Sequence, residues 1–280
     1  MLGAHVSAAG GVDLAPERGH AIGCRAIQIF SRNQNRWDSP PISPETATAF
    51  RSNLKKYHIS FAVTHDSYLI NLCAPDQEKR RRSLAAFRDE LMRAHQLGIG
   101  HVVMHPGSHL QEGETWGIRE IGASINQLLG ELDFDDVKIA LEITAGQGTN
   151  LGYRFEHLRD MIALVKSPER MGICFDTCHG FAAGYELRTA AGWESTWEEF
   201  DRVIGLERLS LFHLNDSKKP FSSRVDRHAN IGDGEIGLEC FAMLMRDSRF
   251  VKTPKILETP DGDEKWADEL KLLKRLSDNR

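Results

Sequence analysis

The sequence predicts an α/β fold, a closed (β/α)8 barrel that occupies residues 1–280 as one domain, on three observations. Apolar, strand-like runs alternate with longer amphipathic stretches along the whole chain, which indicates parallel strands joined by crossover helices. Eight such units occur, the number that closes a barrel of this type, the TIM barrel. The units recur about every 36 residues, which is the length of one strand, one helix and two loops.

The strands are expected where short apolar runs lie between turn residues. These runs are Leu2–Val6, Ala26–Phe30, Phe61–His65, His101–His105, Lys138–Ile143, Met171–Asp176, Leu209–His213 and Pro254–Glu258. Helices are expected where apolar residues recur with a period near 3.6. These stretches include Pro44–Tyr57, Glu78–Leu97, Thr115–Leu129, Phe155–Val165, Thr196–Ile204, Leu238–Met245 and Glu264–Leu276.

Length and composition agree with this fold. Barrels of this type run to about 250 residues as one domain, and this chain has 280. No run approaches the roughly 18 apolar residues of a membrane span. The N-terminus, Met1–Val6, lacks the basic and apolar regions of a secretory signal. Five scattered cysteines then indicate free thiols in a reducing compartment, so a cytoplasmic location and no membrane partner are expected.

The formal net charge of −5 argues weakly, by itself, against a nucleic-acid partner. Some of the acidic residues are candidate metal ligands, however, and bound divalent cations would offset their charge. Three such ions would bring the formal sum to about +1. The net charge of the sequence therefore does not decide whether the protein binds nucleic acid.

A histidine, aspartate or glutamate is the last or next-to-last residue of seven of the eight expected strands, and only the second strand, which ends at Phe30, lacks one. In this architecture the carboxyl ends of the strands carry the active site. The polar strand ends are His5, His65, His105, Glu142, Asp176, His213 and Glu258. Three carboxylates that converge on one barrel mouth would repel one another unless cations or protons neutralise them. A metal cluster is the simplest explanation.

Two local pairs extend the set of candidate ligands. Asp176 and His179 are three residues apart at the end of a strand, and Asp226 and His228 are two apart. Residues i and i+2 of an extended segment point the same way, so the second pair could hold one ion. Histidine nitrogen mixed with carboxylate oxygen favours zinc, manganese or iron over calcium or magnesium.

The number of candidates exceeds what one ion binds, and two or three ions would fit them. Paired ions about 3.5–4 Å apart suit phosphoryl chemistry. Cys174 and Cys178 flank Asp176 but have no zinc-knuckle spacing, so they are interpreted as packing residues. The sequence has no Gly-rich phosphate loop and no dinucleotide fingerprint that would compete with the metal cluster for the functional role.

Eight motifs together resemble the signatures of the endonuclease IV family of apurinic/apyrimidinic (AP) endonucleases, in order and over essentially the whole chain. The motifs are Gly3–Gly11, His65–Leu72, His105–His109, Glu142–Gly148, Phe175–His179, His213–Ser217, Arg224–His228 and Leu257–Thr259. The resemblance implies three divalent metal ions, zinc first, with manganese or iron as alternatives. It implies one ion held by His65, His105 and Glu142. A second would be held by Glu142, Asp176, His213 and Glu258, with Glu142 bridging, and a third by His179, Asp226 and His228.

The implied activity belongs to base excision repair. It is hydrolysis of the phosphodiester 5′ to an abasic site, which leaves a 3′-hydroxyl and a 5′-deoxyribose phosphate, together with the trimming of blocked 3′ ends. Glu142 and Glu258 are the expected catalytic carboxylates, and Glu142 would orient or activate the attacking water. The expected partner is double-stranded DNA that contains abasic sites or blocked 3′ ends, bound by a monomer.

The resemblance also implies residues that contact DNA. Tyr68 and Leu69 match family positions that enter the bent duplex. The loop Ser31–Trp37 is basic and rich in amides, which suits backbone and minor-groove contact. Its expected contact residues are Asn33, Gln34, Asn35 and Arg36. Asn35 departs from the family pattern, because that position is often arginine. Arg227, between two candidate ligands, could clamp a phosphate.

Three alternatives remain open from the sequence. A sugar isomerase or epimerase would use a similar barrel and similar ligands, but it would not need His179, Asp226 and His228 as a third site. A DNA-binding protein without catalysis would keep the metals only for structure. A related enzyme could act on damaged bases in place of abasic sites.

Overall fold

The computed structural model describes residues 1–278, and its main sheet is a closed barrel of eight parallel strands. The strands are β1 (Leu2–His5), β2 (Ala26–Phe30), β3 (Phe61–His65), β4 (His101–Met104), β5 (Lys138–Glu142), β6 (Met171–Asp176), β7 (Leu209–Leu214) and β10 (Lys255–Leu257). Neighbours in this order pair with one another, and β10 pairs with β1 to close the barrel. The predicted (β/α)8 barrel is therefore confirmed.

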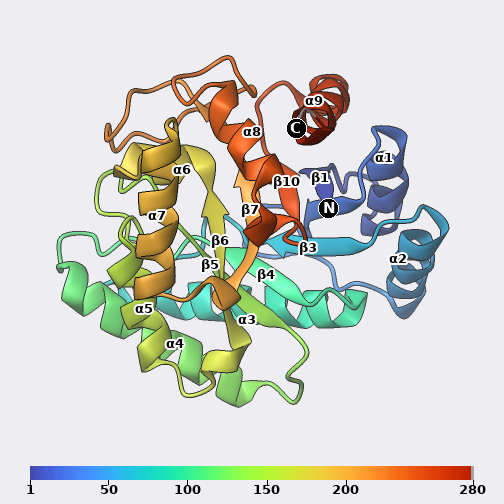
Figure 1. Ribbon diagram of the computed structural model, residues 1–280. Coiled ribbons are helices and arrows are strands. Elements are labelled where there is room, and N and C mark those ends of the chain that lie inside the picture. Colours follow the sequence, from blue (N-terminus) through green and yellow to red (C-terminus); the bar gives the residue numbers. More distant parts are fainter. Residues whose placement is uncertain (279–280) are drawn as a thin grey trace.

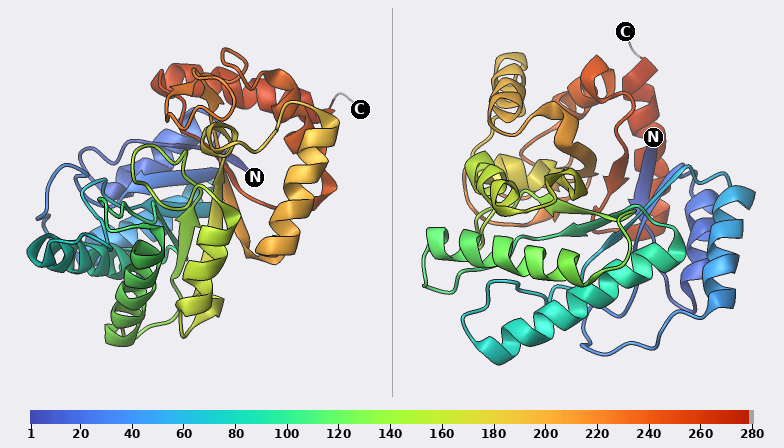
Figure 2. Two further views of the ribbon diagram at one scale, coloured as in Figure 1. Left: turned by 90° about the vertical axis from the view of Figure 1, so that its left-hand side faces the viewer. Right: turned by 90° about the horizontal axis from the view of Figure 1, so that it is seen from below.

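Helices surround the strands in every view (Figures 1 and 2). They are α1 (Ala15–Ala21), α2 (Pro44–Lys56), α3 (Gln77–Leu97), α4 (Glu114–Glu131), α5 (Phe155–Leu164), α6 (Thr177–Ala183), α7 (Ala190–Val203), α8 (Leu238–Arg246) and α9 (Gly262–Asp278). Short 3-10 turns occupy Val12–Leu14, Pro168–Arg170, Leu206–Arg208 and Ser248–Phe250. Within residues 1–278, every helix is too short or too polar to cross a membrane.

Three helices differ from the stretches named from the sequence. Helices α1 and α6 are not among those stretches, and α7 begins at Ala190 and not at Thr196. The first turn of α7 contains alanine and glycine, which carry no amphipathic signal. Its start is fixed by a cap, because the Thr189 hydroxyl accepts the backbone N–H of Gly192 at 3.1 Å.

The longest connection at the mouth of the barrel joins β7 to α8 and spans residues 215–237 (the β7–α8 excursion). It contains a two-stranded antiparallel sheet of β8 (Asp216–Ser217) and β9 (His228–Ala229). Strand β8 contacts α6, and the orange segment that contains both short strands lies beside α6 in Figure 1. This excursion brings residues 226–228 towards the ends of β5 and β6.

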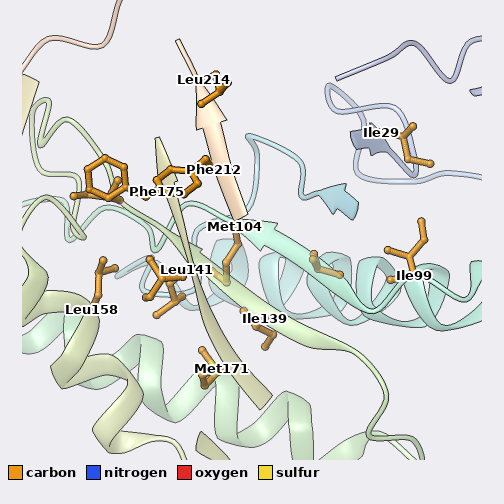
Figure 3. Close-up of a cluster of buried hydrophobic side chains, with 14 of the residues drawn as sticks. Ile29, Ile99, Met104, Ile139, Leu141, Leu158, Met171, Phe175, Phe212 and Leu214 are labelled. Atoms are coloured by element: carbon orange, nitrogen blue, oxygen red, sulfur yellow. The ribbon is translucent and has the colours of Figure 1, made fainter. Parts of the chain in front are cut away.

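The apolar core has two layers because side chains alternate across each strand. The outer layer packs between the strands and the helices, as Figure 3 shows for residues such as Leu141, Leu158 and Phe175. The inner layer fills the barrel with one residue from each of seven strands. These residues are Ala26, Val63, Val103, Ala140, Cys174, Leu211 and Ile256.

Strand β1, the one barrel strand without a residue in this layer, contributes Gly3 at the same height, because Gly3 pairs with Ala26 and Ile256. A Cβ atom added at Gly3 would lie 1.7 Å from the carbonyl oxygen of Ala26. The barrel therefore closes at a point where only glycine fits.

Candidate metal centre

The candidate ligands at the strand ends point into the barrel because they lie two residues after the inner layer. Val63 belongs to that layer, so His65 on the same strand faces the same interior. Ala140 and Glu142 on β5 have the same relation. The same two-residue spacing relates four further pairs, namely Val103 and His105, Cys174 and Asp176, Leu211 and His213, and Ile256 and Glu258. Strand alternation thus places an apolar floor beneath a ring of imidazoles and carboxylates.

Glu142 lies at the centre of this ring and is fully buried. Its Oε2 is 3.1 Å from His65 Nε2 and 3.2 Å from His105 Nε2. Its Oε1 is 3.0 Å from Nδ1 of His213, and that nitrogen is 3.1 Å from Glu258 Oε2. The two oxygens of one carboxylate therefore face two different groups of potential ligands.

Five groups of potential metal ligands result, and within each group the ligand atoms lie within 4.8 Å of one another. Two of them include a cysteine, Cys174 or Cys178, and the other three contain only histidines and carboxylates. The first contains His65, His105 and Glu142. The second contains Glu142, Asp176, His213 and Glu258. The third contains His179, Asp226 and His228. These are the three sets that the family resemblance implies, so the structure brings all nine residues together in the expected grouping.

The third group assembles from two distant segments. Asp176 caps α6 by accepting the backbone N–H of His179 at 2.9 Å, which fixes the start of the helix that carries that imidazole. Asp226 and His228 arrive on the β7–α8 excursion. His179 Nε2 is 3.2 Å from Asp226 Oδ2, and His228 Nε2 is 3.2 Å from Asp226 Oδ1.

Hydrogen bonds on the outer side of the imidazoles fix which nitrogen faces the site. His65 Nδ1 lies 2.9 Å from the carbonyl oxygen of Asp66, and His179 Nδ1 lies 3.0 Å from that of Ile143. These nitrogens donate to the carbonyls, so each Nε2 lone pair faces its group. Lone pairs and carboxylate oxygens that converge in this way are suited to divalent cations.

The electrostatics of the metal-free site support the same interpretation. Burial alone would raise the pKa of Glu142, but the imidazoles of His213 and His105 hold it well below its ordinary value. Burial would lower the pKa of His228, yet Asp176 and Asp226 raise it to about 9. Without metal, a proton on His228 thus offsets part of the negative charge of Asp176 and Asp226.

Cys174 and Cys178 also lie near the carboxylates, but their thiols are poor candidates for ligands. Burial raises the pKa of Cys174 well above its ordinary value and that of Cys178 to about 12. A thiol binds metal as the thiolate, and both environments oppose that form. Their expected role as packing residues fits Cys174, which lies in the inner layer of the barrel.

Gln28 on β2 is a part of the centre that the sequence analysis missed. Its Oε1 lies 2.8 Å from His213 Nε2, and its Nε2 lies 2.5 Å from Glu258 Oε1 and 2.9 Å from His5 Nδ1. The amide accepts from His213 and donates to Glu258, so it fixes both potential ligands. His5 also contacts Glu258 Oε1, at 2.9 Å, but it is not a member of any ligand group. Only the position of Gln28, two residues after Ala26, signals its inward orientation.

Asp216 organises the excursion that carries the third group. Its Oδ1 accepts the backbone N–H groups of Ser217 at 2.7 Å and Ile236 at 2.9 Å. Its Oδ2 accepts those of Gly232 at 3.0 Å and Gly237 at 3.3 Å. One buried carboxylate thus satisfies four backbone donors of a segment without long regular structure.

A groove of about 940 Å³ opens beside the metal-ligand groups. Its lining includes His228 and Glu258 from the ligand groups, and it includes four of the expected DNA contacts, namely Asn33, Gln34, Asn35 and Tyr68. Tyr68 is 63% exposed at the rim. Gln34 is tied to the Tyr68 turn, because its carbonyl oxygen accepts the Ser67 hydroxyl at 2.6 Å.

The remaining expected DNA contacts lie outside the lining of this groove. Arg36 and Arg227 are exposed, and Leu69 is half-buried. The Asn35 side chain is exposed, and its backbone N–H is bound to Asn33 Oδ1 at 2.9 Å. These positions leave the side chains free to meet a ligand larger than the groove.

Binding of zinc to the metal-free protein near neutral pH is expected to release more than one proton per chain. The pKa of His228 is raised to about 9 and that of His179 is raised well above 6.5, so both rings are protonated before metal binds. Zinc affinity should therefore rise with pH up to about 9, where the contribution of His228 ends. Calorimetric titration in two buffers of different ionisation enthalpy measures the proton count. Heats that do not depend on the buffer near pH 7 would contradict the raised pKa values of these two imidazoles in the metal-free protein.

Comparison with known proteins places the chain among similar barrels. A family model described as a xylose isomerase-like TIM barrel matches residues 16–276. The chain is 50% identical over 271 residues to a protein named probable endonuclease 4 from Geotalea daltonii, a match that covers 97% of this chain and 95% of the relative. It is 51% identical over 271 residues to the protein of the same name from Chloroflexus aurantiacus, with coverage of 97% and 95%. Among solved structures, endonuclease IV from Thermus thermophilus matches with a TM-score of 0.88 and 35% identity, covering 100% of this chain and 99% of that one.

Proposed function

Since this chain belongs to the endonuclease 4 family of xylose isomerase-like TIM barrels, we propose that it is a metal-dependent AP endonuclease of base excision repair. It hydrolyses the phosphodiester 5′ to an abasic site in double-stranded DNA and leaves a 3′-hydroxyl and a 5′-deoxyribose phosphate. It also removes blocking groups from 3′ ends. We further propose that it acts as a one-domain monomer in the cytoplasm.

The observation that carries this proposal is the position of Glu142 between two groups of ligands. One of its oxygens faces His65 and His105, and the other faces His213. A carboxylate shared in this way suits two neighbouring ions, which is the arrangement used for in-line displacement at phosphorus. The third group, around Asp226, suits a further ion beside them.

The donor set fits three divalent cations of the zinc class, because it combines imidazole nitrogen with carboxylate oxygen and lacks accessible thiolate. The three ions would be held by the three ligand groups described above. When bound, such ions lower the pKa of water and stabilise the charge on phosphate and on the leaving oxygen.

The protein's own residues position these groups. Glu142 orients the attacking water from the centre of the site. Glu258 is held by Gln28 and His5, which leaves its Oε2 directed at His213. The apolar floor beneath the ring excludes bulk water from the lower barrel, so charges in the ring interact more strongly. We propose Glu142 and Glu258 as the catalytic carboxylates on this basis.

The groove and its rim suit DNA that contains a missing base. An abasic nucleotide is extruded at lower cost than an intact one, which favours its entry into the metal pocket. The exposed Tyr68, followed by Leu69, is placed to fill the gap left in the stack. Asn33, Gln34, Asn35 and Arg36 would contact the backbone and minor groove, and Arg227 a phosphate.

The third ligand group favours a nuclease over a sugar isomerase or epimerase. Such enzymes act with one or two ions, and they would gain nothing from His179, Asp226 and His228 brought together at the rim. An exposed tyrosine beside the pocket is likewise unnecessary for a small sugar. Activity on damaged bases is a separate possibility, and cutting of a duplex that carries a damaged base, compared with one that carries an abasic analogue, tests it.

The test uses a duplex with a single tetrahydrofuran abasic analogue and the same duplex without it. The purified protein is expected to cut 5′ to the analogue, to lose this activity after strong chelation and to regain it with zinc. Metal content by mass spectrometry should approach three ions per chain. A duplex with an oxidised base in the same position measures the rival substrate. Absence of a cut 5′ to the analogue under every metal condition would refute the proposed function.

A further inference from the structure

The loop between β2 and α2, residues 31–43, carries Asn33–Arg36 to the rim but contains no helix or strand of its own. Two local hydrogen bonds shape its tip. Asn33 Oδ1 accepts the backbone N–H of Asn35 at 2.9 Å, and the Asn33 carbonyl accepts that of Arg36 at 3.2 Å. The other backbone groups of the loop need partners from elsewhere, because no strand ladder satisfies them.

Arg93, on α3, supplies three of these partners. Its Nη1 donates to the carbonyl oxygen of Ser31 at 3.3 Å, and its Nη2 donates to those of Ser39 at 3.2 Å and Pro40 at 2.6 Å. Its Nε donates to Asp89 Oδ2 at 2.6 Å. Arg93 is buried, so the guanidinium connects both ends of the loop to the helix from within the protein.

Arg32 holds the tip of the same loop from inside. Its Nη2 donates to the carbonyl oxygen of Arg36 at 3.0 Å and to that of Trp37. Its Nη1 donates to Asp89 Oδ2 at 3.1 Å, the carboxylate oxygen that Arg93 also uses. Two buried guanidiniums, joined by one carboxylate, thus satisfy five loop carbonyls, while the side chain of Arg36 stays exposed.

The same face of α3 makes two further contacts with this loop. Glu90 Oε2 accepts the hydroxyl of Ser31 at 2.6 Å, and the guanidinium of Arg82 lies 4.5 Å from the centre of the Trp37 ring. Positions 82, 89, 90 and 93 fall on one side of an α-helix. Helix α3 therefore presents a continuous surface on which the loop is mounted.

We propose that Arg93, Arg32 and Asp89 are positioning residues that hold the β2–α2 loop in its DNA-binding conformation before DNA arrives. Burying two guanidiniums is costly, and an apolar contact would stabilise the fold at least as well. What the charges add is a defined backbone path for a loop without regular structure. A preformed loop loses less conformational freedom on binding, so it raises affinity for DNA without acting on the reacting atoms. This inference rests on the proposed DNA substrate.

The test replaces Arg93 with lysine and with alanine. Lysine keeps a charge near Asp89, but its three N–H donors on one nitrogen are too few to bind Asp89 and all three carbonyls at once. Both variants are expected to raise the KM for the tetrahydrofuran duplex by about tenfold or more, with kcat changed by less than about threefold. Metal content should equal that of the wild type. Hydrogen exchange of residues 31–40 should be faster in both variants, and this readout needs no substrate.

Arg88 offers a matched control, because it lies on the same helix and pairs with Glu131 on the exposed side. Arg88→Ala should leave KM and loop exchange unchanged. An unchanged KM in folded Arg93→Lys would overturn the inference, as would an equal loss in kcat accompanied by loss of metal. Failure of the wild type to cut the duplex would refute the proposed function instead, and the exchange of the loop would still decide whether α3 holds it.

Discussion

Replacement of Glu142 by glutamine is expected to slow incision of abasic DNA by about a thousandfold or more, while the variant still binds the duplex. The side chain is fully buried, and its two oxygens face different ligand groups. Glutamine has the same shape but presents only one oxygen and no charge. One of the two groups then faces an amide N–H₂, which cannot bind a cation.

Single-turnover cutting of the tetrahydrofuran duplex, with fluorescence anisotropy for binding, separates the two effects. Glu194→Gln is the matched control, since this glutamate is exposed, pairs with Arg249 and belongs to none of the ligand groups. It should cut at the wild-type rate. Near-normal turnover by Glu142→Gln would refute the role of this residue as a shared ligand and as the carboxylate that orients water.

Replacement of Asp216 by alanine is expected to destabilise the protein by on the order of 4 kcal/mol and to empty the third ligand group. Four backbone N–H groups lose their acceptor at once, and each unsatisfied donor that stays buried costs about 1–3 kcal/mol. The total cost is smaller than the sum of the four penalties, because the loosened segment admits water that binds some of the donors. Asp226 and His228 lie on that segment, so their approach to His179 depends on it.

Denaturant unfolding and metal content measure the two consequences. Asp233→Ala is the control, because this exposed aspartate lies in the same segment and makes only a long surface ion pair with Lys265. Its effect should stay within about 0.5 kcal/mol. Asp216→Asn, which retains one acceptor oxygen, should fall between the two. Wild-type stability and full metal content in Asp216→Ala would show that the carboxylate does not organise the third group.

The barrel and its polar mouth could be predicted because both depend on alternation along single strands. An apolar run that ends in His65 or Glu142 carries its signal within a few residues. Eight such runs at a regular spacing then require a closed sheet. All nine candidate ligands could be named from the sequence, although grouping them into three sets needed the family resemblance.

The supporting contacts could not be predicted, since they involve backbone atoms or pairs remote in sequence. Gln28 and His213 are 185 residues apart, and no local pattern relates them. Asp216 and Arg93 bind backbone N–H and carbonyl groups, which every residue type carries. The partners of such side chains depend on the path of the loop, and the path becomes visible only in three dimensions.

The two-residue spacing between floor and ring has a consequence for how such an enzyme can change. Structural stability and reactivity occupy two successive levels on the inward face of the same strands, with Val63, Ala140 and Leu211 in the lower level and His65, Glu142 and His213 in the upper level. Substitutions at the upper positions can therefore change the chemistry of the site while the apolar layer beneath it stays the same. A combinatorial library confined to those upper positions should yield mostly folded barrels, whereas one confined to the lower positions should yield few.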